Sequence, residues 1–264
     1  MKFALVNGER REAEKGLQGT CVSCNHPMVA KCGSVKINHW SHKGKRICDP
    51  WWENETEWHR DWKAHFPTDW QEVIHFDPDT GEKHIADVKT DHGWVIEFQH
   101  SYLKSEERKS RNEFYKKIVW VVDGARLKND AKRFKQAIED GVPFLVNMRE
   151  VFPDFCPLLK DWSDCNMPVF FDFGLSSANP EKSVLWVLMP RTNKINVHIF
   201  PYSRNDFLEV YLKGESIKAL EFEKFINDWP KIVNNEARRQ EVQMTREQNS
   251  KNSNITFSRR RNRL

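Results

Sequence analysis

The chain has 264 residues, which is enough for one large domain or two modest ones, each with its own core. With 39% hydrophobic and 30% charged residues, the composition is that of a globular protein. The chain has no run of the roughly 18 apolar residues that cross a membrane, and residues 1–16 have no apolar stretch suited to a secretory signal. We therefore expect an intracellular, cytoplasmic protein without a membrane partner. The net charge of +4 leaves nucleic acid open as a partner, because the excess positive charge is concentrated at the carboxyl end.

Residues 1–52 predict a small metal-binding module. A strand over 2–6 and a turn at Asn7-Gly8 come first. Four of the six Cys lie in this segment, and clustered Cys in a reducing compartment favour metal binding over disulfides. Because so polar a segment has little core of its own, we expect a bound ion to hold it together.

The expected ligands are Cys21, Cys24, His39 and His42. Two thiolates and two imidazoles give four nitrogen and sulfur donors, which suit a closed, tetrahedral, structural Zn²⁺ site. The spacing of the two His is one residue tighter than in the usual finger, so we expect a zinc ribbon. Cys48 or Cys32 could replace one of the two His as ligand.

From residue 53 onward the hydrophobic pattern predicts an α+β (α/β sandwich) fold. Trp58, Trp62 and Phe66 recur at helical spacing, and the continuous apolar run over 118–122 is typical of a strand buried on both faces. The elements expected in a core over 53–150 are a helix over 53–65, strands over 71–76, 83–89 and 94–99, a helix over 104–117, a strand over 118–122, a helix over 130–140 and a strand over 144–151.

Residues 151–248 predict an α+β extension that could bind a partner protein or nucleic acid. Its strands over 168–173, 184–189 and 195–200 would form a small antiparallel sheet, followed by one or two helices over 216–248 interrupted at Pro230.

The end of the chain, residues 249–264, is expected to be a basic disordered tail. From Arg238 to Leu264 there are seven Arg and one Lys against two Glu, a net charge of +6. Contact with nucleic-acid phosphates and plain solvation are equally good interpretations of this composition.

The strongest candidate site lies on the hairpin over residues 84–99. If Thr90 pairs with Trp94, residues 91–93 form a three-residue loop that ends on a glycine, which suits a hairpin. The same register places Asp87 opposite Glu97 on one face of the sheet, with Cβ atoms about 5 Å apart. A slip of one residue would separate the two acids.

Two carboxylates this close repel each other unless a cation lies between them. Oxygen ligands suit Mg²⁺, or Mn²⁺, which keeps waters for a substrate phosphate and can generate hydroxide near neutral pH. The hairpin therefore predicts a metal-dependent phosphodiesterase, and ordinary solvated acids on a surface hairpin are the alternative.

The sequence resembles the competence protein CoiA family, whose nuclease core belongs to the restriction-endonuclease-like (PD-(D/E)XK) superfamily. The resemblance covers about residues 20–125. The residues that carry it are Cys21-Val-Ser-Cys24, His39-Trp-Ser-His42, Thr56-Glu-Trp-His59 with Lys63, Ala86-Asp87-Val88, Ile96-Glu97-Phe98-Gln99 with Ser101, and Arg111 to Tyr115 before Ile118.

The resemblance implies a core of helix, three-stranded meander, helix and strand, with Asp87 and Glu97 as Mg²⁺ ligands. It implies DNA as the substrate, in DNA uptake, recombination or defence against phage. The chain departs from the superfamily at Gln99, where Lys is usual. Gln cannot carry charge or act as a base, but it can orient a water or a phosphate oxygen. Lys89 could supply the missing cation, or it could simply be solvated.

Two helices would frame this site. On the first, the resemblance makes Glu57 a further catalytic acid, and His59 and Lys63 share a face that could reach the phosphate or leaving group. On the second, Arg111 and Tyr115, with Arg108, share a face that could contact phosphates. Incidental surface charges are the alternative for both helices.

The sequence thus predicts a metal-dependent nuclease acting on nucleic acid. One alternative is a His-Asn-His-type nuclease in which His39 and His42 are catalytic. Another is a non-catalytic zinc-ribbon protein that binds nucleic acid.

Overall fold

The computed structural model describes residues 1–44, 48–51, 55–174, 183–192 and 195–261, and for 248–261 the backbone alone. Within these residues the fold is α+β, as predicted, with two sheets and six α-helices. The chain divides into two units, Met1–Leu220 and Glu221–Leu264. No helix of the described residues is both long enough and apolar enough to cross a membrane.

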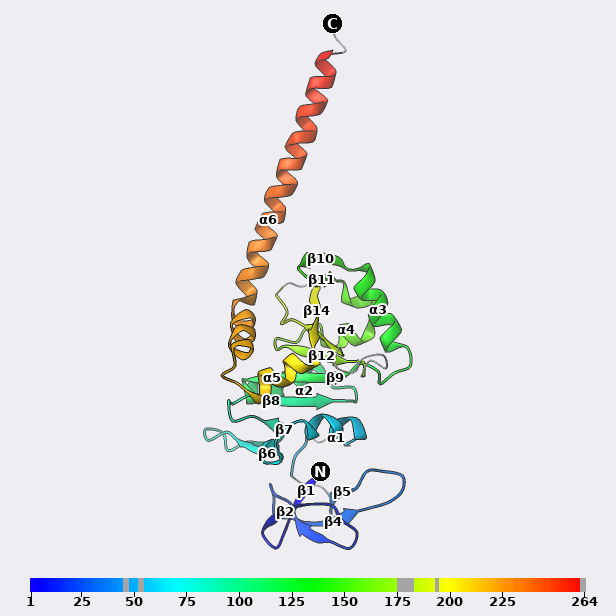
Figure 1. Ribbon diagram of the computed structural model, residues 1–264, viewed down its shortest axis with the longest axis vertical. Helices are drawn as coiled ribbons and strands as arrows, with labels where there is room; N and C mark the ends of the chain where they lie inside the picture. The colour runs from blue at the N-terminus through cyan, green and yellow to red at the C-terminus, as the bar shows by residue number, and fades with distance from the viewer. Residues whose placement is uncertain (45–47, 52–54, 175–182, 193–194, 262–264) are drawn as a thin grey trace. The chain divides into compact units, whose positions relative to one another are not determined.

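The amino-terminal module is a five-stranded antiparallel sheet in the order β2-β1-β3-β4-β5 (Figure 1). Its strands are β1 (Phe3–Val6), β2 (Glu9–Glu12), β3 (Gln18–Thr20), β4 (Pro27–Lys31) and β5 (His39–His42). The predicted turn at Asn7 and Gly8 is confirmed, and both residues have positive φ. The buried core is small, with Ala4, Met28 and Trp40 at its centre, as expected for a segment that needs a further stabilising element.

The second sheet, in the order β10-β11-β14-β13-β12-β9-β8-β7-β6, has nine strands among the described residues. They are β6 (Gln71–Phe76), β7 (Lys83–Lys89), β8 (Val95–Gln99), β9 (Ile118–Asp123), β10 (Val142–Leu145), β11 (Met148–Val151), β12 (Val169–Asp172), β13 (Val184–Leu188) and β14 (Val197–Ser203). The pairs β8–β9 and β9–β12 are parallel, and the other pairs are antiparallel.

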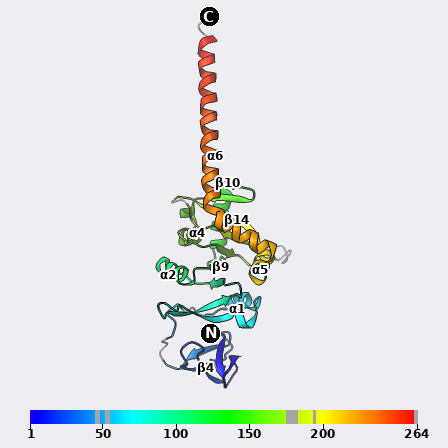
Figure 2. The same cartoon turned by 90° about the vertical axis from the view of Figure 1, so that its left-hand side faces the viewer.

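Helices cover both faces of this sheet. They are α1 (Glu57–Ala64), α2 (Ser105–Tyr115), α3 (Asp130–Asp140), α4 (Pro157–Trp162) and α5 (Arg204–Leu212), with 3₁₀ turns η1 (Thr68–Trp70) and η2 (Pro153–Phe155). Figure 2 shows α1 and α5 on one side of the sheet and α2 and α4 on the other. Trp62 of α1 stacks on Phe98 of β8, while Phe134 of α3 packs on Phe171 of β12 from the opposite side.

Two expectations for the second half of the chain need correction. The strands β12, β13 and β14 do not form a separate small sheet, because β12 pairs with β9 and extends the core sheet. Val169, Phe170 and Phe171 are fully buried, so β12 has the apolar character of a central strand. The strand expected over 144–151 is a hairpin of β10 and β11, in which Asn147 has a φ of 60°.

The second unit is formed by α6 (Ile217–Arg261), which begins in the first unit. The expected interruption at Pro230 is wrong, since the proline lies inside the helix. The φ of a proline is close to that of a helix, and only one backbone hydrogen bond is lost. A helix can therefore continue past a proline, usually with a kink. Residues 249–261, expected as a disordered tail, are helical as well, and 262–264 lie outside the described residues.

The boundary expected after residue 52, and the helix start expected at residue 53, also lie outside the described residues. The first described helix turn begins at Glu57, where Thr56 caps it. The Thr56 hydroxyl accepts from the backbone N–H of His59, and the His59 ring accepts from the backbone N–H of Thr56. This reciprocal cap fixes the start of α1 and therefore the positions of the residues that follow.

Candidate active site and metal cluster

The hairpin of β7 and β8 has the predicted register. The ladder pairs Val88 with Ile96 and Lys89 with Val95. The loop over 91–93 closes on Gly93, whose φ of 82° is a conformation that glycine adopts freely. The next position in this register places Asp87 opposite Glu97.

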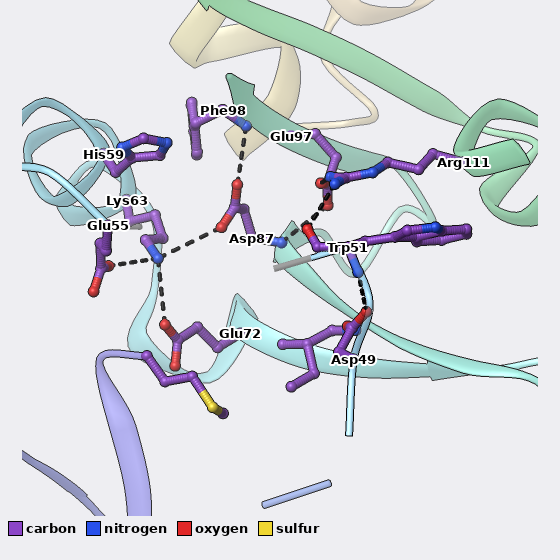
Figure 3. Close-up of a pocket in the computed structure, with 12 residues that line it drawn as sticks. Asp49, Trp51, Glu55, His59, Lys63, Glu72, Asp87, Glu97, Phe98 and Arg111 are labelled. Atoms are coloured by element: carbon purple, nitrogen blue, oxygen red, sulfur yellow. Dashed lines mark hydrogen bonds and ion pairs between the residues drawn. The ribbon is translucent and has the colours of Figure 1, made fainter. Parts of the chain in front are cut away.

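At these two acids, side chains replace the backbone ladder (Figure 3). The backbone N–H of Asp87 donates to Glu97 Oε1 at 3.2 Å, and the backbone N–H of Phe98 donates to Asp87 Oδ2 at 3.0 Å. Both carboxylates therefore lie in the gap between the two strands rather than on one face. From this gap they reach the helices on both sides of the sheet.

A third acid, Glu72 on β6, occupies the corresponding position of the neighbouring strand. It falls between two register pairs, Gln71 with Val88 and Val73 with Ala86, and so lies across from Asp87. Its φ is 48°, a conformation that costs free energy for a residue with a side chain. The Glu72 carboxylate accepts hydrogen bonds from the backbone N–H groups of Lys2 and Phe3. The amino-terminal module thus holds one wall of the site.

On the α1 side, Lys63 connects the acids. Its Nζ lies 2.6 Å from a carboxylate oxygen of Glu55, 3.3 Å from Glu72 and 3.5 Å from Asp87. The Lys63 side chain is 3% exposed, and that of Asp87 is 26% exposed. Asp87 is therefore the most accessible group of this cluster.

On the α2 side, Arg111 holds Glu97. Its Nη1 lies 2.9 Å from Glu97 Oε2, and its Nη2 donates to the backbone carbonyl of Trp51 and pairs with Glu107. Burial, reinforced by the negative charge of Asp87, raises the pKa of Glu97 to about 8, although Arg111 opposes the shift. A further cation beside Glu97 would favour its ionised form.

These groups surround a cavity of about 60 Å³. Its lining includes Asp49, Glu55, His59, Lys63, Glu72, Asp87, Glu97, Phe98 and Arg111. This volume holds a few waters or a partly hydrated ion. A nucleotide does not fit inside, so a substrate could meet the site only at its rim, where Asp87 is partly exposed.

Comparisons with known proteins give no relative. No protein-family model, curated protein or solved structure matches the chain. The chemistry of the site therefore has to be argued from its residues.

Three of the predicted site residues lie away from the cavity. Gln99 is buried, and its amide donates to the backbone carbonyl and hydroxyl of Ser101. Glu57 is exposed on α1, and the acid that reaches the cavity from this region is Glu55. Tyr115 is 4% exposed, so it cannot serve as a surface contact for phosphates. Burial raises the pKa of its hydroxyl well above the ordinary value.

The basic residues expected to bind nucleic acid are buried as well. Lys63 and Arg111 face carboxylates of the site rather than solvent. Arg108 is 1% exposed, lies over the ring of Trp162 and pairs with Asp164. The expectation of a basic helix face at the surface of α2 is therefore wrong, because α2 packs this face against the sheet and α4.

The metal cluster of the amino-terminal module consists of Cys21, Cys24, His42 and Cys48. Its ligand atoms lie within 4.8 Å of one another. The Sγ atoms of Cys21 and Cys48 are 3.9 Å apart, and His42 Nε2 lies 3.3 Å from Cys24 Sγ and 3.4 Å from Cys48 Sγ. A tetrahedral Zn²⁺ with ordinary bond lengths separates such atoms by about 3.6–3.8 Å. This Cys₃His cluster could bind a metal such as zinc.

Three of the four expected ligands, Cys21, Cys24 and His42, belong to this cluster. Cys48 takes the place of His39, the exchange that the sequence left open, and Cys32 donates instead to the backbone carbonyl of Ala13. The His39 ring contacts the backbone carbonyl of Ile37 through Nδ1. Because His39 and His42 are three residues apart on the strand β5, their side chains point to opposite faces and cannot both face one ion.

A short path of contacts connects the metal cluster with Glu97. Asp49 follows Cys48 of this cluster, and its carboxylate accepts from the His84 ring and from the backbone N–H groups of Trp51 and Ile85. The Trp51 ring stacks on His84, with 3.3 Å between ring centroids. The Trp51 carbonyl in turn accepts from Arg111, the partner of Glu97.

Sequence reasoning missed Glu55, Glu72 and Asp49 as members of the site. Glu72 had a signal, because the turn over 77–81 fixes the register of β6 against β7 and so aligns Glu72 with Asp87. Glu55 lies one residue before the helix cap Thr56 and has no periodic pattern of its own. Only the packing of α1 on β8 reveals its position.

Proposed function

We propose that the protein is a metal-dependent nuclease that hydrolyses phosphodiester bonds, with DNA as the favoured substrate. The observation that carries this proposal is the position of Asp87 and Glu97. Their carboxylates lie between β7 and β8, where they accept backbone hydrogen bonds across the pair, and they line a cavity that holds a few waters. Together with Lys63 and Arg111, the two acids form a charged and partly buried site. Burying charges costs free energy, so such a site is more readily explained by a function than by stability.

The donor set fits Mg²⁺ or Mn²⁺. Asp87 and Glu97 offer carboxylate oxygens, the ligand type that these ions prefer. Burial first, and the charge of Asp87 second, raise the pKa of Glu97, and a divalent ion beside it would favour its ionised form. When bound, the ion supplies an activated water and stabilises negative charge on the phosphate.

The residues of the chain have separate tasks in this proposal. Asp87 and Glu97 would hold the ion, and Arg111 would fix the orientation of Glu97 through its bonds to Trp51 and Glu107. His59 lines the cavity and could contact the substrate phosphate or the leaving group. Gln99, which is turned toward Ser101, is left without a role in the reaction.

The order of elements agrees with the family resemblance noted in the sequence. Helix α1, the meander β6-β7-β8, helix α2 and strand β9 follow one another, and the acids lie where β7 and β8 separate. We therefore propose a restriction-endonuclease-like core related to CoiA, in which the Cys₃His cluster holds a structural Zn²⁺. The role suggested by this relationship is DNA uptake, recombination or defence against phage.

The positions of two His argue against a His-Asn-His-type site. His42 belongs to the Cys₃His cluster, and His39 contacts a backbone carbonyl. In such an enzyme His39 would have to be catalytic. The variant His39→Ala separates the two possibilities, since the proposal here expects it to retain cleavage.

A cleavage assay tests the proposal. The purified zinc-containing protein is incubated with single- and double-stranded DNA in Mg²⁺ or Mn²⁺, and wild type is compared with Asp87→Asn and with the matched control Asp91→Asn in the loop of the same hairpin. We expect metal-dependent cleavage by wild type and Asp91→Asn and a loss of at least about 100-fold in Asp87→Asn. Binding of DNA without cleavage by wild type would instead favour a non-catalytic zinc-ribbon protein.

A further inference from the structure

The ammonium group of Lys63 is enclosed by acids. Glu55, Glu72 and Asp87 each place a carboxylate oxygen within 3.5 Å of its Nζ. The side chains of Lys63, Glu55 and Glu72 are 3%, 6% and 6% exposed. Three carboxylates around one buried cation are an arrangement that proteins otherwise use to bind metal ions with oxygen ligands.

Several backbone features hold the ammonium in this place. The reciprocal cap of Thr56 and His59 sets the start of α1, about two turns before Lys63. Glu72 adopts a positive φ and is held by the backbone N–H groups of Lys2 and Phe3. Strain and buried hydrogen bonds in the same place show that the surroundings determine the position of Glu72 closely.

The two cations flank the two candidate metal ligands from opposite sides. Lys63, from α1, lies beside Asp87, and Arg111, from α2, lies beside Glu97 (Figure 3). The cavity of about 60 Å³ lies among these four groups. The space between Asp87 and Glu97 can therefore receive one ion, while the other side of Asp87 already has a positive charge.

We propose that Lys63 serves as a built-in second cation, so that the site binds one divalent ion where the same acids alone would bind two. This inference rests on the proposed nuclease function and assigns Lys63 as a positioning residue. Its ammonium offsets part of the negative charge of Glu55 and Glu72 and holds one oxygen of Asp87, leaving the remaining coordination positions of Asp87 to a single ion. Lys63 also supplies the positive charge that Gln99 cannot.

The burial of Lys63 does not leave it neutral. Burial alone would lower its pKa, but the charges of Glu72, Asp87 and Glu55 outweigh burial and raise the pKa well above the ordinary value. The same pairing lowers the pKa of Glu72 although burial opposes the shift. Three carboxylate oxygens within 3.5 Å of Nζ therefore favour the charged ammonium at the position that a second metal ion would take.

Counting bound Mn²⁺ by electron paramagnetic resonance, on zinc-containing protein, tests this inference. Mn²⁺ prefers oxygen ligands, so it leaves a thiolate-rich zinc cluster undisturbed. We expect one Mn²⁺ per chain in wild type. We expect two in Lys63→Met, because the ammonium no longer occupies the space between Glu55, Glu72 and Asp87. Lys89→Met is the matched control, since Lys89 lies two residues beyond Asp87 on β7, and it should still bind one.

The outcomes separate this inference from the proposed function. No bound Mn²⁺ in wild type would remove the metal site itself. Two ions in wild type, or one ion in a folded Lys63→Met variant, would overturn the role of Lys63 and leave the nuclease proposal standing. A lysine that only stabilises the fold would not change the number of bound ions.

The loss of Lys63 removes the cation shared by three carboxylates, two of them buried, which could prevent folding. The double variant Lys63→Met, Glu72→Gln restores the net charge of the cluster and keeps the test decisive. We expect it to bind a second Mn²⁺ between Glu55 and Asp87, more weakly than Lys63→Met because one ligand is lost. A folded double variant with a single ion would contradict the inference.

Discussion

Arg111 Nη1 lies 2.9 Å from Glu97 Oε2, and both side chains are at most 7% exposed. This ion pair joins a helix residue to the acid that we propose as a metal ligand. A divalent ion therefore has to share Glu97 with a guanidinium that is itself held by the Trp51 carbonyl and by Glu107. The arrangement makes the stability of the metal-free protein depend on the charge of Glu97.

Stability without divalent ions should fall as the pH rises. The pKa of Glu97 is raised from 4.5 to about 8 by burial and by Asp87. The folded state therefore binds this proton more tightly than the unfolded state, and its contribution is greatest below pH 4.5 and is lost as the pH rises through 8. Wild type should lose more stability than Glu97→Gln between pH 6 and pH 9, as followed by urea denaturation in metal-free buffer. Parallel pH profiles would contradict this assignment.

Zinc binding should depend on Cys48 and not on His39, which sequence spacing had predicted as a ligand. Cys48→Ser removes one of four ligands and should lose most of its zinc, while His39→Ala should retain about one Zn²⁺ per chain, as in an ordinary structural site. Zinc content by atomic absorption measures both. A zinc-free His39→Ala variant beside a zinc-loaded Cys48→Ser variant would show that the cluster has the originally expected ligands.

Asp49 should be important for stability although it is outside the catalytic pair. Its carboxylate is 7% exposed and accepts from the His84 ring and from two backbone N–H groups. Burial would raise its pKa, but the hydrogen bonds from His84, Ile85 and Trp51 outweigh burial and lower it.

Asp49→Ala should therefore reduce the free energy of unfolding by about 3 kcal/mol, because charged hydrogen bonds are lost and buried donors are left unpaired. Chemical denaturation measures the change. The exposed turn residue Asp79, replaced by Ala, provides the control and should change stability by less than about 0.5 kcal/mol. Equal stability of the two variants would show that the link between the module and Glu97 is unimportant.

Tyr115→Phe should leave DNA affinity unchanged and stabilise the protein. The hydroxyl is buried and has no hydrogen-bond partner in the part of the chain that the structure describes. Removing an unsatisfied buried hydroxyl should increase the free energy of unfolding by about 1 kcal/mol. Thermal denaturation and a DNA-binding titration check both statements. A several-fold loss of affinity would restore Tyr115 as a phosphate contact.

The sequence predicted the hairpin closely because local rules decide it. Gly93 determines the loop, the loop determines the register, and the register brings Asp87 opposite Glu97. The helix at Asp130–Asp140 followed from periodicity in the same way. In each case the decisive residues are close in sequence.

The features that the sequence did not predict depend on contacts between segments that are distant in the chain. The exchange of His39 for Cys48 depends on the placement of Cys48, which follows β5 in the chain, beside Cys21, Cys24 and His42. The burial of Lys63 and Arg111 depends on two helices packing on opposite sides of one pair of strands. A basic residue on an amphipathic helix has the same pattern whether it meets a phosphate or a buried acid, so spacing alone cannot distinguish the two.

The most direct test of the account is the single-turnover rate of DNA cleavage by Glu97→Gln in saturating Mg²⁺, beside wild type and with DNA binding measured on the same samples. The variant keeps the shape of the side chain but loses the charge that would hold the ion. We predict a rate at least about 100-fold below that of wild type, with DNA affinity within about threefold. Cleavage by Glu97→Gln at a rate similar to that of wild type would contradict the assignment of this hairpin as the active site.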